Sequence, residues 1–380
     1  MRFPKPNNIV AEKYVAGMSL FKSKLAKIKL SANESALGPS PKARKQYLEV
    51  SKNFARYPDS DGTFLRNTLA NKFKIDKNRV ILGSGSDQIF ELICKSFLKK
   101  GDEVIVPKFS FIIYRIYSRM NGAKVIYSKE NNFTVSTKDI LKKVTRKTKI
   151  VFLANPNNPT GTYIPKEELL FLRKKLRSDI LLVVDDAYFE YVKNKDYLSG
   201  LKTFTNFKNV VMTRTFSKIY GLAGLRVGWG YGSKEIISAL NKVKPPFNVS
   251  RPALFAASAA VKDGSWLNKE IKHVNKWNKK LFSEFKKMRI ETNKSFTNFL
   301  LVKFDKVKIN SAKVFRLLAK SGILVRKMDV YGIKNSLRIT IGTTSENIAL
   351  IKKMRKILKK STSKKVLKKR WSKYENTFKK

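Results

Sequence analysis

The sequence predicts an α/β protein with a mostly parallel central sheet in a large domain, followed by a smaller α+β domain. The chain has 380 residues, of which 42% are hydrophobic, and this is enough for two cores. Short apolar runs rich in Val, Ile and Leu recur between residues 63 and 231. They are nearly continuous, which is typical of strands buried on both faces. Helical patterns separate them, and this alternation predicts a parallel sheet covered on both sides.

The predicted elements of the large domain can be read in chain order. The strands are residues 79–83, 102–107, 123–128, 149–156, 180–188, 209–216 and 225–232. The helices between them are residues 87–101, 113–123 and 165–178, where apolar residues recur at helical spacing. Cys94 lies in the first of these amphipathic helices, where it is expected to be a small core residue.

A second pattern follows the large domain. Helices are expected over residues 250–261 and on to 288, and then strands at 297–304, 323–328 and 336–342 alternate with helices at 311–322 and 345–360. We therefore predict four segments. They are an N-terminal arm with part of the small domain (1–50), the large domain (51–245), the small C-terminal domain (246–360) and a basic tail (361–380).

The charge is extreme, with 81 Lys and Arg against 28 Asp and Glu, or formally +53. Such an excess often indicates nucleic acid or an anionic membrane as a partner. Here the lysines are spread along the whole chain, so we interpret them as solvated faces and expect no specific nucleic-acid partner. No apolar run reaches the length of a membrane span, and the first residues lack the apolar region of a signal peptide.

The rare residue types exclude several kinds of chemistry. The single cysteine rules out an internal disulfide and fits a reducing cytoplasm, where we expect the protein to reside. The single histidine, His273, lies in a lysine-rich helical stretch. Together these counts exclude Ser-His-Asp catalysis, zinc fingers and histidine-based metal sites, so we expect no metal.

The residues that could carry chemistry follow the predicted strands. Gly83 to Asp87 form a glycine-rich turn at the start of a helix, which is typical of a phosphate site. Asn158 lies in the turn "NPNNPTG", which follows the apolar residues 149–154. Asp185 follows the apolar residues 180–184, and Tyr188 stands three residues later. Because ligands bind at the carboxyl ends of parallel strands, these side chains are expected to share one pocket.

The stretch "TFSKIYGLAGLRVGW" supplies the remaining candidates. Thr215, Ser217 and Arg226 could reach a phosphate, and Lys218 lies among them as a possible nucleophile toward a carbonyl. A turn that leaves Lys218 in water would explain the same residues taken alone. Combined with the other strand ends, they describe a pocket for a phosphorylated aldehyde that carries a ring nitrogen.

At this point the residues resemble a known family, the fold type I pyridoxal-phosphate aminotransferases. "NPNNPTG", "VVDDAYFEY" and "TFSKIYGLAGLRVGW" are similar to its hallmark segments and stand in the expected order. "RYPDSDG", "LGSGSDQ", "GILVRKM" and "LRITIGTTSEN" resemble the histidinol-phosphate aminotransferase subfamily more narrowly. The resemblance runs from about Tyr14 to Lys360. The chain departs from the subfamily pattern at Ser35 and at Gln88.

The resemblance implies pyridoxal 5′-phosphate as the cofactor and assigns roles to residues. Lys218 would be joined to the cofactor and then move the proton, Asp185 would keep the ring nitrogen protonated, and Tyr188 would complete the catalytic set. The other cofactor contacts would come from backbone and side-chain groups of Ser86, Asp87, Phe111, Asn158, Thr215, Ser217 and Arg226.

The resemblance also implies substrates and a partner subunit. Tyr57 would reach the cofactor phosphate of a neighbouring subunit, so a homodimer is expected. Tyr14, Arg326 and Arg338 would bind the anionic end of the substrates, which would be histidinol phosphate and glutamate or 2-oxoglutarate. An aromatic aminotransferase or a threonine-phosphate decarboxylase of the same fold remains an alternative. A polyanion-binding protein on an aminotransferase fold is the alternative from a different class.

Overall fold

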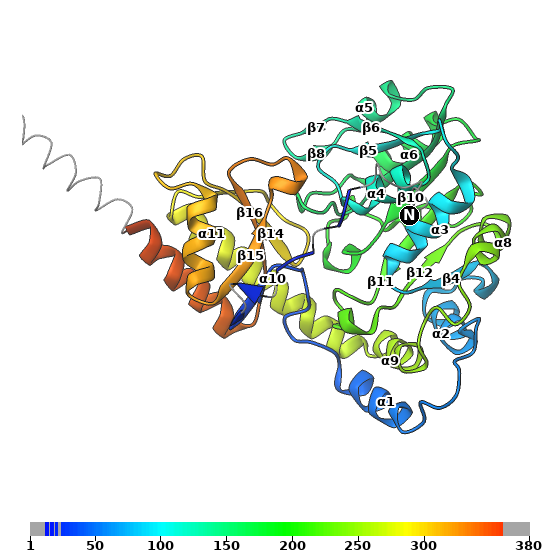
Figure 1. The fold of residues 1–380 in the computed structure, drawn as a ribbon, viewed down its shortest axis with the longest axis horizontal. Coiled ribbons are helices and arrows are strands. Elements are labelled where there is room, and N and C mark those ends of the chain that lie inside the picture. The colour runs from blue at the N-terminus through cyan, green and yellow to red at the C-terminus, as the bar shows by residue number, and fades with distance from the viewer. Residues whose placement is uncertain (1–11, 15, 19, 22–23, 360–380) are drawn as a thin grey trace, which may run out of the picture. The chain divides into compact units, whose positions relative to one another are not determined.

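The structure is a computed structural model, and the residues it describes are 12–14, 16–18, 20–21 and 24–359 (Figure 1). The basic tail predicted at 361–380 lies outside the described residues. The described chain forms two compact units. One contains residues 34–273 with 12–14 and 296–298, and the other contains 16–33, 274–295 and the chain from 299 onward. The four-segment division predicted from the sequence stays a prediction.

A seven-stranded sheet forms the centre of the first unit, in the order β4-β12-β11-β10-β9-β5-β6. Its strands are β4 (Val80–Gly83), β5 (Glu103–Pro107), β6 (Lys124–Ser128), β9 (Thr148–Ala154), β10 (Leu181–Asp185), β11 (Val210–Thr215) and β12 (Gly228–Tyr231). Only β12 runs antiparallel to its neighbours. The strands between β4 and the edge strand β6 are almost wholly buried. The prediction of a mostly parallel sheet is therefore confirmed.

Helices surround this sheet. They are α1 (Pro41–Ser51), α2 (Thr63–Phe73), α3 (Ser86–Phe97), α4 (Ile113–Met120), α5 (Thr137–Lys142), α6 (Lys166–Lys175), α7 (Gly200–Phe204), α8 (Lys234–Val243), α9 (Arg251–Lys262) and the start of α10 (Gly264–Lys287). Helix α3 contacts α4, α8, β4 and β12, whereas α1 and α2 pack on α9. Cys94 is buried in α3, in agreement with its predicted core position.

The second unit contains a five-stranded sheet in the order β13-β14-β16-β15-β3. These strands are β13 (Glu291–Thr292), β14 (Phe299–Lys303), β16 (Ser336–Thr340), β15 (Ile323–Lys327) and β3 (Ile28–Leu30). Helix α11 (Ser311–Lys320) packs on β15, and a further helix covers residues 344–359. Strand β3 was not predicted, because three residues among lysines make no apolar run. It forms by parallel pairing with β15, almost 300 residues later in the chain.

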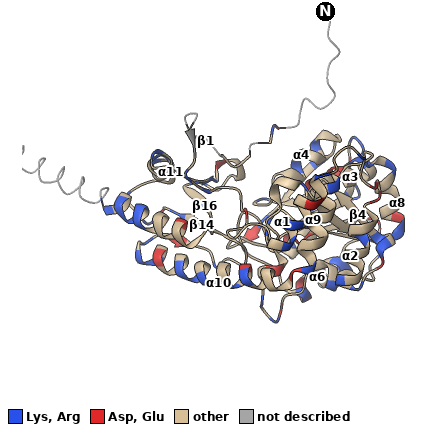
Figure 2. Cartoon of the chain, turned by 90° about the horizontal axis from the view of Figure 1, so that it is seen from below, with Lys and Arg blue, Asp and Glu red and all other residues tan. Residues whose placement is uncertain are grey.

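Lysine and arginine cover the helices of both units without gathering on one element (Figure 2). This distribution is the one that solvated helix faces would give. Among the described residues, no helix combines the length and the apolar composition needed to cross a membrane.

A close backbone approach shapes the turn that carries Lys218. Gly221 has a φ of +69°, and a Cβ at this position would lie 2.3 Å from the carbonyl carbon of Gly38. No side chain fits there, because the obstacle is backbone and cannot swing away. Gly224, three residues on, has open space around it and serves as a matched comparison.

We expect Gly221→Ala to lower the free energy of unfolding by about 1–3 kcal/mol, since it adds both a backbone clash and an unfavourable φ. Gly224→Ala should change it by no more than about 0.5 kcal/mol. Chemical denaturation of both variants measures the difference. Equal, small effects would show that the Gly38 loop moves aside easily.

Candidate active site

The polar residues predicted from the sequence lie at the carboxyl edge of the seven-stranded sheet. Asp185 is the last residue of β10, Thr215 is the last of β11, and the Gly83–Asp87 turn joins β4 to α3. Asn158 follows β9 and is buried. Because β4, β9, β10 and β11 run in the same direction, one edge of the sheet presents all these groups together.

Asp185 is a buried acid at this edge, held by three hydrogen bonds. Its Oδ2 accepts a hydrogen bond from the Tyr114 hydroxyl at 2.7 Å. Its Oδ1 accepts from the backbone N–H of Ala187 at 3.2 Å and from Thr213 Oγ1 at 3.3 Å. Burial raises the pKa of Asp185 to about 7, although the Tyr114 bond opposes that rise. A cation placed against this carboxylate would therefore be strongly favoured.

Tyr114 and Thr213 are site residues that the sequence analysis missed. Both could have been found by spacing. Tyr114 stands three residues after Phe111, on the same face of the turn into α4, and its ring packs edge-on against Phe111 at 5.7 Å. Thr213 stands two residues before Thr215, on the same face of β11, and it is paired in register with Asp185. Burial raises the pKa of Tyr114, so its hydroxyl remains a donor.

The start of α3 forms a cradle for an anion. Gly85 precedes the helix with a φ of 80°, and the N–H groups of Ser86 and Asp87 lie in its first turn. A Cβ on Gly85 would lie 2.4 Å from Arg226 Nη2, and one on Gly228 would lie 2.4 Å from the nitrogen of Ser86. The cradle thus needs glycine at both positions.

Arg226 closes the cradle from the other side. Its Nη1 donates to Ser217 Oγ at 3.2 Å, and its Nη2 pairs with Asp87 Oδ2 at 3.2 Å. The N–H of Ser217 donates to Thr215 Oγ1 at 3.1 Å. Burial raises the pKa of Asp87, and the charges of Arg226 and Lys218 oppose that rise. Ser86, Asp87, Thr215, Ser217 and Arg226 are thus brought into one cluster.

Lys218 and Tyr188 lie beside this cluster. The Nζ of Lys218 is 5.9 Å from the centre of the Tyr188 ring, which is buried. The "NPNNPTG" turn is tied to the loop that carries Phe111, because Asn157 donates to the carbonyl oxygen of Phe109 at 2.8 Å. Tyr14 packs edge-on against Phe111 with 6.5 Å between ring centres. The segments that carry these predicted pocket residues therefore lie next to one another in space.

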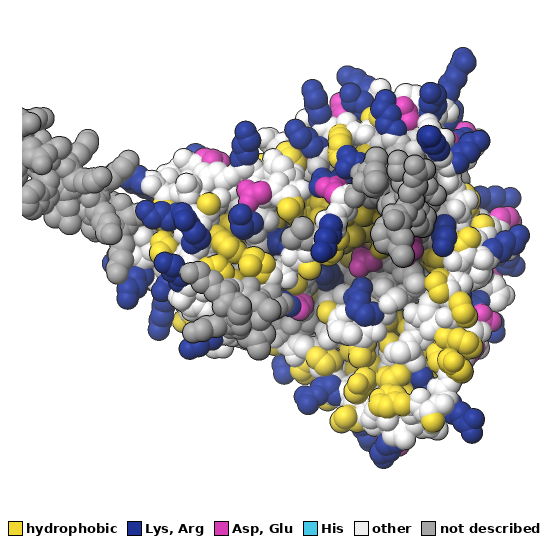
Figure 3. Space-filling model, viewed as in Figure 1, with side chains coloured by type: hydrophobic (Ala, Val, Ile, Leu, Met, Phe, Trp, Pro, Cys, Tyr) yellow, Lys and Arg dark blue, Asp and Glu magenta, His cyan; other side chains and the backbone are white. Residues whose placement is uncertain are grey.

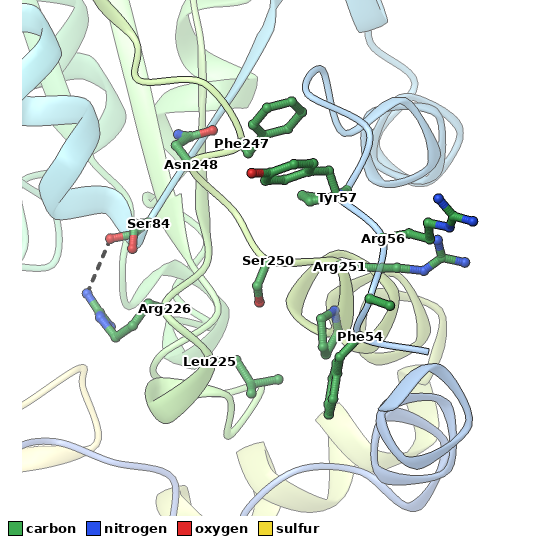
Figure 4. A pocket seen from close by; sticks show the side chains of 13 residues that line it. Phe54, Arg56, Tyr57, Ser84, Leu225, Arg226, Phe247, Asn248, Ser250 and Arg251 are labelled. Carbon is green, nitrogen blue, oxygen red and sulfur yellow. Dashed lines mark hydrogen bonds between the residues drawn. The ribbon is translucent and has the colours of Figure 1, made fainter. Parts of the chain in front are cut away.

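Tyr57 lies apart from these groups. Its side chain is 78% exposed and stacks on Phe247 with 4.6 Å between ring centres. Both rings line an open pocket of about 780 Å³ that extends to Ser84 and Arg226 (Figure 4). Tyr57 is thus presented at the surface, on the outer side of the phosphate cradle.

Arg326 and Arg338 belong to the second unit. They face each other as direct cross-strand partners on β15 and β16, and both are buried. Arg338 donates to the carbonyl oxygen of Ser31 at 3.0 Å, and Arg326 donates to the carbonyl oxygen of Ala16. Two guanidinium groups opposite each other repel, so an anion between them would relieve the repulsion.

Comparison with known proteins identifies the family. Residues 26–353 match the model of aminotransferase class I and II. A histidinol-phosphate aminotransferase of Pelagibacter ubique is 52% identical over 92% of this chain and 98% of its own length. One from Nitrobacter hamburgensis is 40% identical over 90% and 95%. The chain belongs to the class I and II aminotransferases, in the histidinol-phosphate aminotransferase family.

The solved structures agree in fold. Histidinol-phosphate aminotransferase from Sinorhizobium meliloti, crystallised with pyridoxal-5′-phosphate, superposes with a TM-score of 0.85 at 23% identity, over 92% of this chain and 97% of that one. The predicted fold type I architecture is therefore confirmed. This chain is a pyridoxal-phosphate-dependent enzyme, as its resemblance implied.

The residues of this aminotransferase fit the cofactor. The buried Asp185 carboxylate lacks a cationic partner among the described contacts that fix it, and a protonated ring nitrogen would supply one. The glycine-lined cradle of Ser86, Asp87 and Arg226 suits a phosphate. Lys218, beside this cluster, carries an amine of the kind that could join an aldehyde.

We expect the cofactor-free protein to carry a pH-dependent cost at Asp185. Its folded pKa, about 7, lies above the usual 3.8, so the folded state binds the proton more tightly. Stability should then fall as pH rises from about 4 to 7, by up to about 1.4 kcal/mol per pH unit. Asp185→Asn removes this contribution.

The free energy of unfolding of the two cofactor-free proteins, measured at several pH values, tests this expectation. The variant should gain on the wild type as pH rises through this window. A constant difference between them would contradict the assigned burial cost.

Proposed function

We propose that this enzyme transfers an amino group from L-histidinol phosphate to 2-oxoglutarate, reversibly, forming imidazole-acetol phosphate and L-glutamate. The relatives with 52% and 40% identity bear the name of this activity. The observation in the molecule that carries the proposal is the buried pair Arg326 and Arg338. The cytoplasm is the proposed location, because a biosynthetic enzyme meets its substrates there.

The arginine pair suits the anions of both substrates. Histidinol phosphate carries no carboxylate, so its phosphate is the group to be held, whereas glutamate brings carboxylates. The planar guanidinium donates two parallel hydrogen bonds to either kind of anion. We propose that Arg338 serves both substrates, that Arg326 favours the phosphate, and that Tyr14 adds a hydroxyl.

We propose that three side chains carry the chemistry. Pyridoxal phosphate, when bound, supplies an electron-accepting ring that stabilises negative charge on the substrate carbon. Lys218 would hold the cofactor at its aldehyde carbon and, once the substrate amine has taken its place there, would move a proton to and from the substrate carbon. Asp185, held by Tyr114 and Thr213, keeps the proton on the ring nitrogen. Tyr188 donates to the ring oxygen and orients it.

The remaining residues bind and orient. The N–H groups of Ser86 and Asp87 bind the cofactor phosphate together with Thr215, Ser217 and Arg226. Asn158 donates to the ring oxygen beside Tyr188. The Phe111 side chain packs against Tyr114 and would cover one face of the cofactor ring, which excludes water there. These assignments are proposals that the cluster's geometry supports.

We propose that the enzyme is a homodimer in which Tyr57 reaches the cofactor phosphate of the partner subunit. Hydrophobic side chains gather over the region of α1, α2 and α9 (Figure 3). Leu48 on α1 and Phe64 on α2 are exposed, and so are Phe54 and Phe247, which line one pocket with Tyr57. An exposed apolar surface of this kind is typical of a protein interface. The names of the relatives favour none of the alternatives, and the formal charge of +53 is the only feature that supports polyanion binding.

Lys218→Ala should lower the rate of amino transfer by about 10³-fold or more, because no other amine replaces the nucleophile. The purified variant should also lose the visible absorbance of the joined cofactor while keeping the wild-type circular dichroism. Lys242→Ala, an exposed lysine on α8, is the control and should behave like the wild type. Full activity in Lys218→Ala would overturn the proposed reaction.

Arg338→Ala should impair the half-reactions with glutamate and with histidinol phosphate alike. Arg326→Ala should cost histidinol phosphate about 1.5–3 kcal/mol in kcat/KM, as expected for a hydrogen bond to a charged group, and glutamate less. Steady-state kinetics with each substrate, and with phenylalanine, measures the split. Equal small losses in Arg326→Ala, with good turnover of phenylalanine, would favour an aromatic aminotransferase.

A further inference from the structure

Arg214 is a buried arginine on the face of the central sheet opposite the cofactor site. It lies in β11 between Thr213 and Thr215, and side chains alternate along a strand. Thr213 contacts Asp185, and Thr215 contacts Ser217. Arg214 therefore points away from the pocket, into the protein behind it.

An acid and a hydroxyl hold the charge of Arg214. Its Nη2 donates to Ser199 Oγ at 3.0 Å and lies 3.7 Å from Asp186 Oδ2. Asp186 also accepts the N–H groups of Gly200 and Leu201, at the start of α7, at 2.9 and 3.2 Å. The side chains of Arg214 and Asp186 are 5% and 0% exposed, so this is a buried ion pair.

Aromatic rings enclose the rest of the guanidinium. Its central carbon lies 3.6 Å from the ring centre of Phe189, 4.7 Å from Phe73 and 5.4 Å from Trp229. Such contacts favour a cation. Nε and Nη1 nevertheless have no hydrogen-bond partner among the described residues. A buried ion pair of this kind often stabilises a fold no better than apolar residues of equal volume would.

The contacts of Arg214 are chain neighbours of the residues that carry the chemistry. Asp186 directly follows Asp185, and Phe189 directly follows Tyr188. Trp229 directly follows Gly228, the glycine that packs under the nitrogen of Ser86. The side chain of Arg214 thus contacts the segments that carry Asp185, Tyr188 and the cradle at the start of α3.

The lysine segment joins the same cluster through Glu190 and Tyr220. Burial raises the pKa of Glu190 to about 8, and the charge of Arg214 and the Tyr220 hydroxyl oppose that rise. Tyr220 stands two residues after Lys218 and is buried. Burial likewise raises the pKa of Asp186 to about 6, and the charge of Arg214 is the largest effect that opposes this rise.

We propose that Arg214 is a positioning residue of the active site, which acts through Asp186 and the aromatic rings to hold Asp185, Tyr188 and the phosphate cradle in register for the cofactor. This inference rests on the roles proposed above for Asp185, Tyr188 and the cradle. Arg214 touches neither cofactor nor substrate. It orders the segments that do.

Arg173 provides a matched control. It is equally buried in the same unit, but its guanidinium donates to the backbone carbonyls of Leu176, Arg177 and Ile180, at the end of α6. None of these residues neighbours a site residue in the chain. Loss of Arg173 should therefore report what losing a buried arginine does to stability alone.

The experiment compares Arg214→Met, Arg214→Lys and Arg173→Met with the wild type. Four quantities are measured: the dissociation constant of pyridoxal phosphate added to the cofactor-free protein, the thermal unfolding temperature of that protein, and kcat and KM for glutamate. We expect Arg214→Met to weaken cofactor binding and lower kcat by about tenfold or more each, because the site loses its geometry. KM for glutamate should stay within about threefold of the wild-type value. The cofactor affinity and kcat of Arg214→Lys should lie between those of the wild type and those of Arg214→Met.

Arg173→Met should unfold at a lower temperature while its cofactor affinity and kcat stay within about twofold of the wild type. The same result in Arg214→Met would overturn the proposal, because it would leave only a structural role. If Arg214→Met does not fold, Arg214→Lys decides by the same criterion.

Asp186→Asn tests the route of the effect. If Arg214 acts through Asp186, this variant should also weaken cofactor binding, and the double variant with Arg214→Met should be no worse than the worse single one. Fully additive losses would contradict that route. Failure of the proposed reaction would show in the wild type and in Lys218→Ala, whereas cofactor affinity in the Arg214 variants reports on the positioning role independently.

Discussion

Two adjacent carboxylates stand where the central strand β10 ends: Asp185 is its last residue, Asp186 follows it, and the two face opposite sides of the sheet. Neither can be buried as a charge without partners. Asp185 is held by Tyr114, Thr213 and a backbone N–H, in an arrangement that still favours one more positive charge. Asp186 is held by Arg214 and by the start of α7. Much of the surrounding structure supplies partners to these two groups.

Close packing at glycine supports this arrangement. Strand β12 lies between β4 and β11 and carries Gly228, where the backbone of the α3 turn approaches too closely for any side chain. Gly85 likewise leaves room for the guanidinium of Arg226, where a Cβ would collide with it. The phosphate cradle is therefore built from backbone groups at fixed positions. Binding sites of this kind need little rearrangement when an anion arrives.

Burial distinguishes a few arginines from the large basic surplus. The chain carries a formal charge of +53, and in its described part Lys and Arg are spread over the helices of both units (Figure 2). In the described part of the chain the buried cationic side chains are those of Arg173, Arg214, Arg326 and Arg338, and no lysine is among them. Their environments are of three kinds: backbone carbonyls for Arg173, an acid with aromatic rings for Arg214, and a cross-strand pair for Arg326 and Arg338. Composition alone gives no sign of these differences.

The sequence by itself determined the strands of the central sheet and the groups at their ends. Continuous apolar runs mark strands buried on both faces, and Asp185, Lys218 and the glycine turn stand directly beside such runs. Only the tertiary structure decided that Tyr114 bonds to Asp185, 71 positions away, that β3 joins β15, and that Arg214 meets Asp186. The physical reason is that strand formation and turn chemistry depend on near neighbours in the chain. The partner of a buried polar group is set by which distant segments the packed core brings against it.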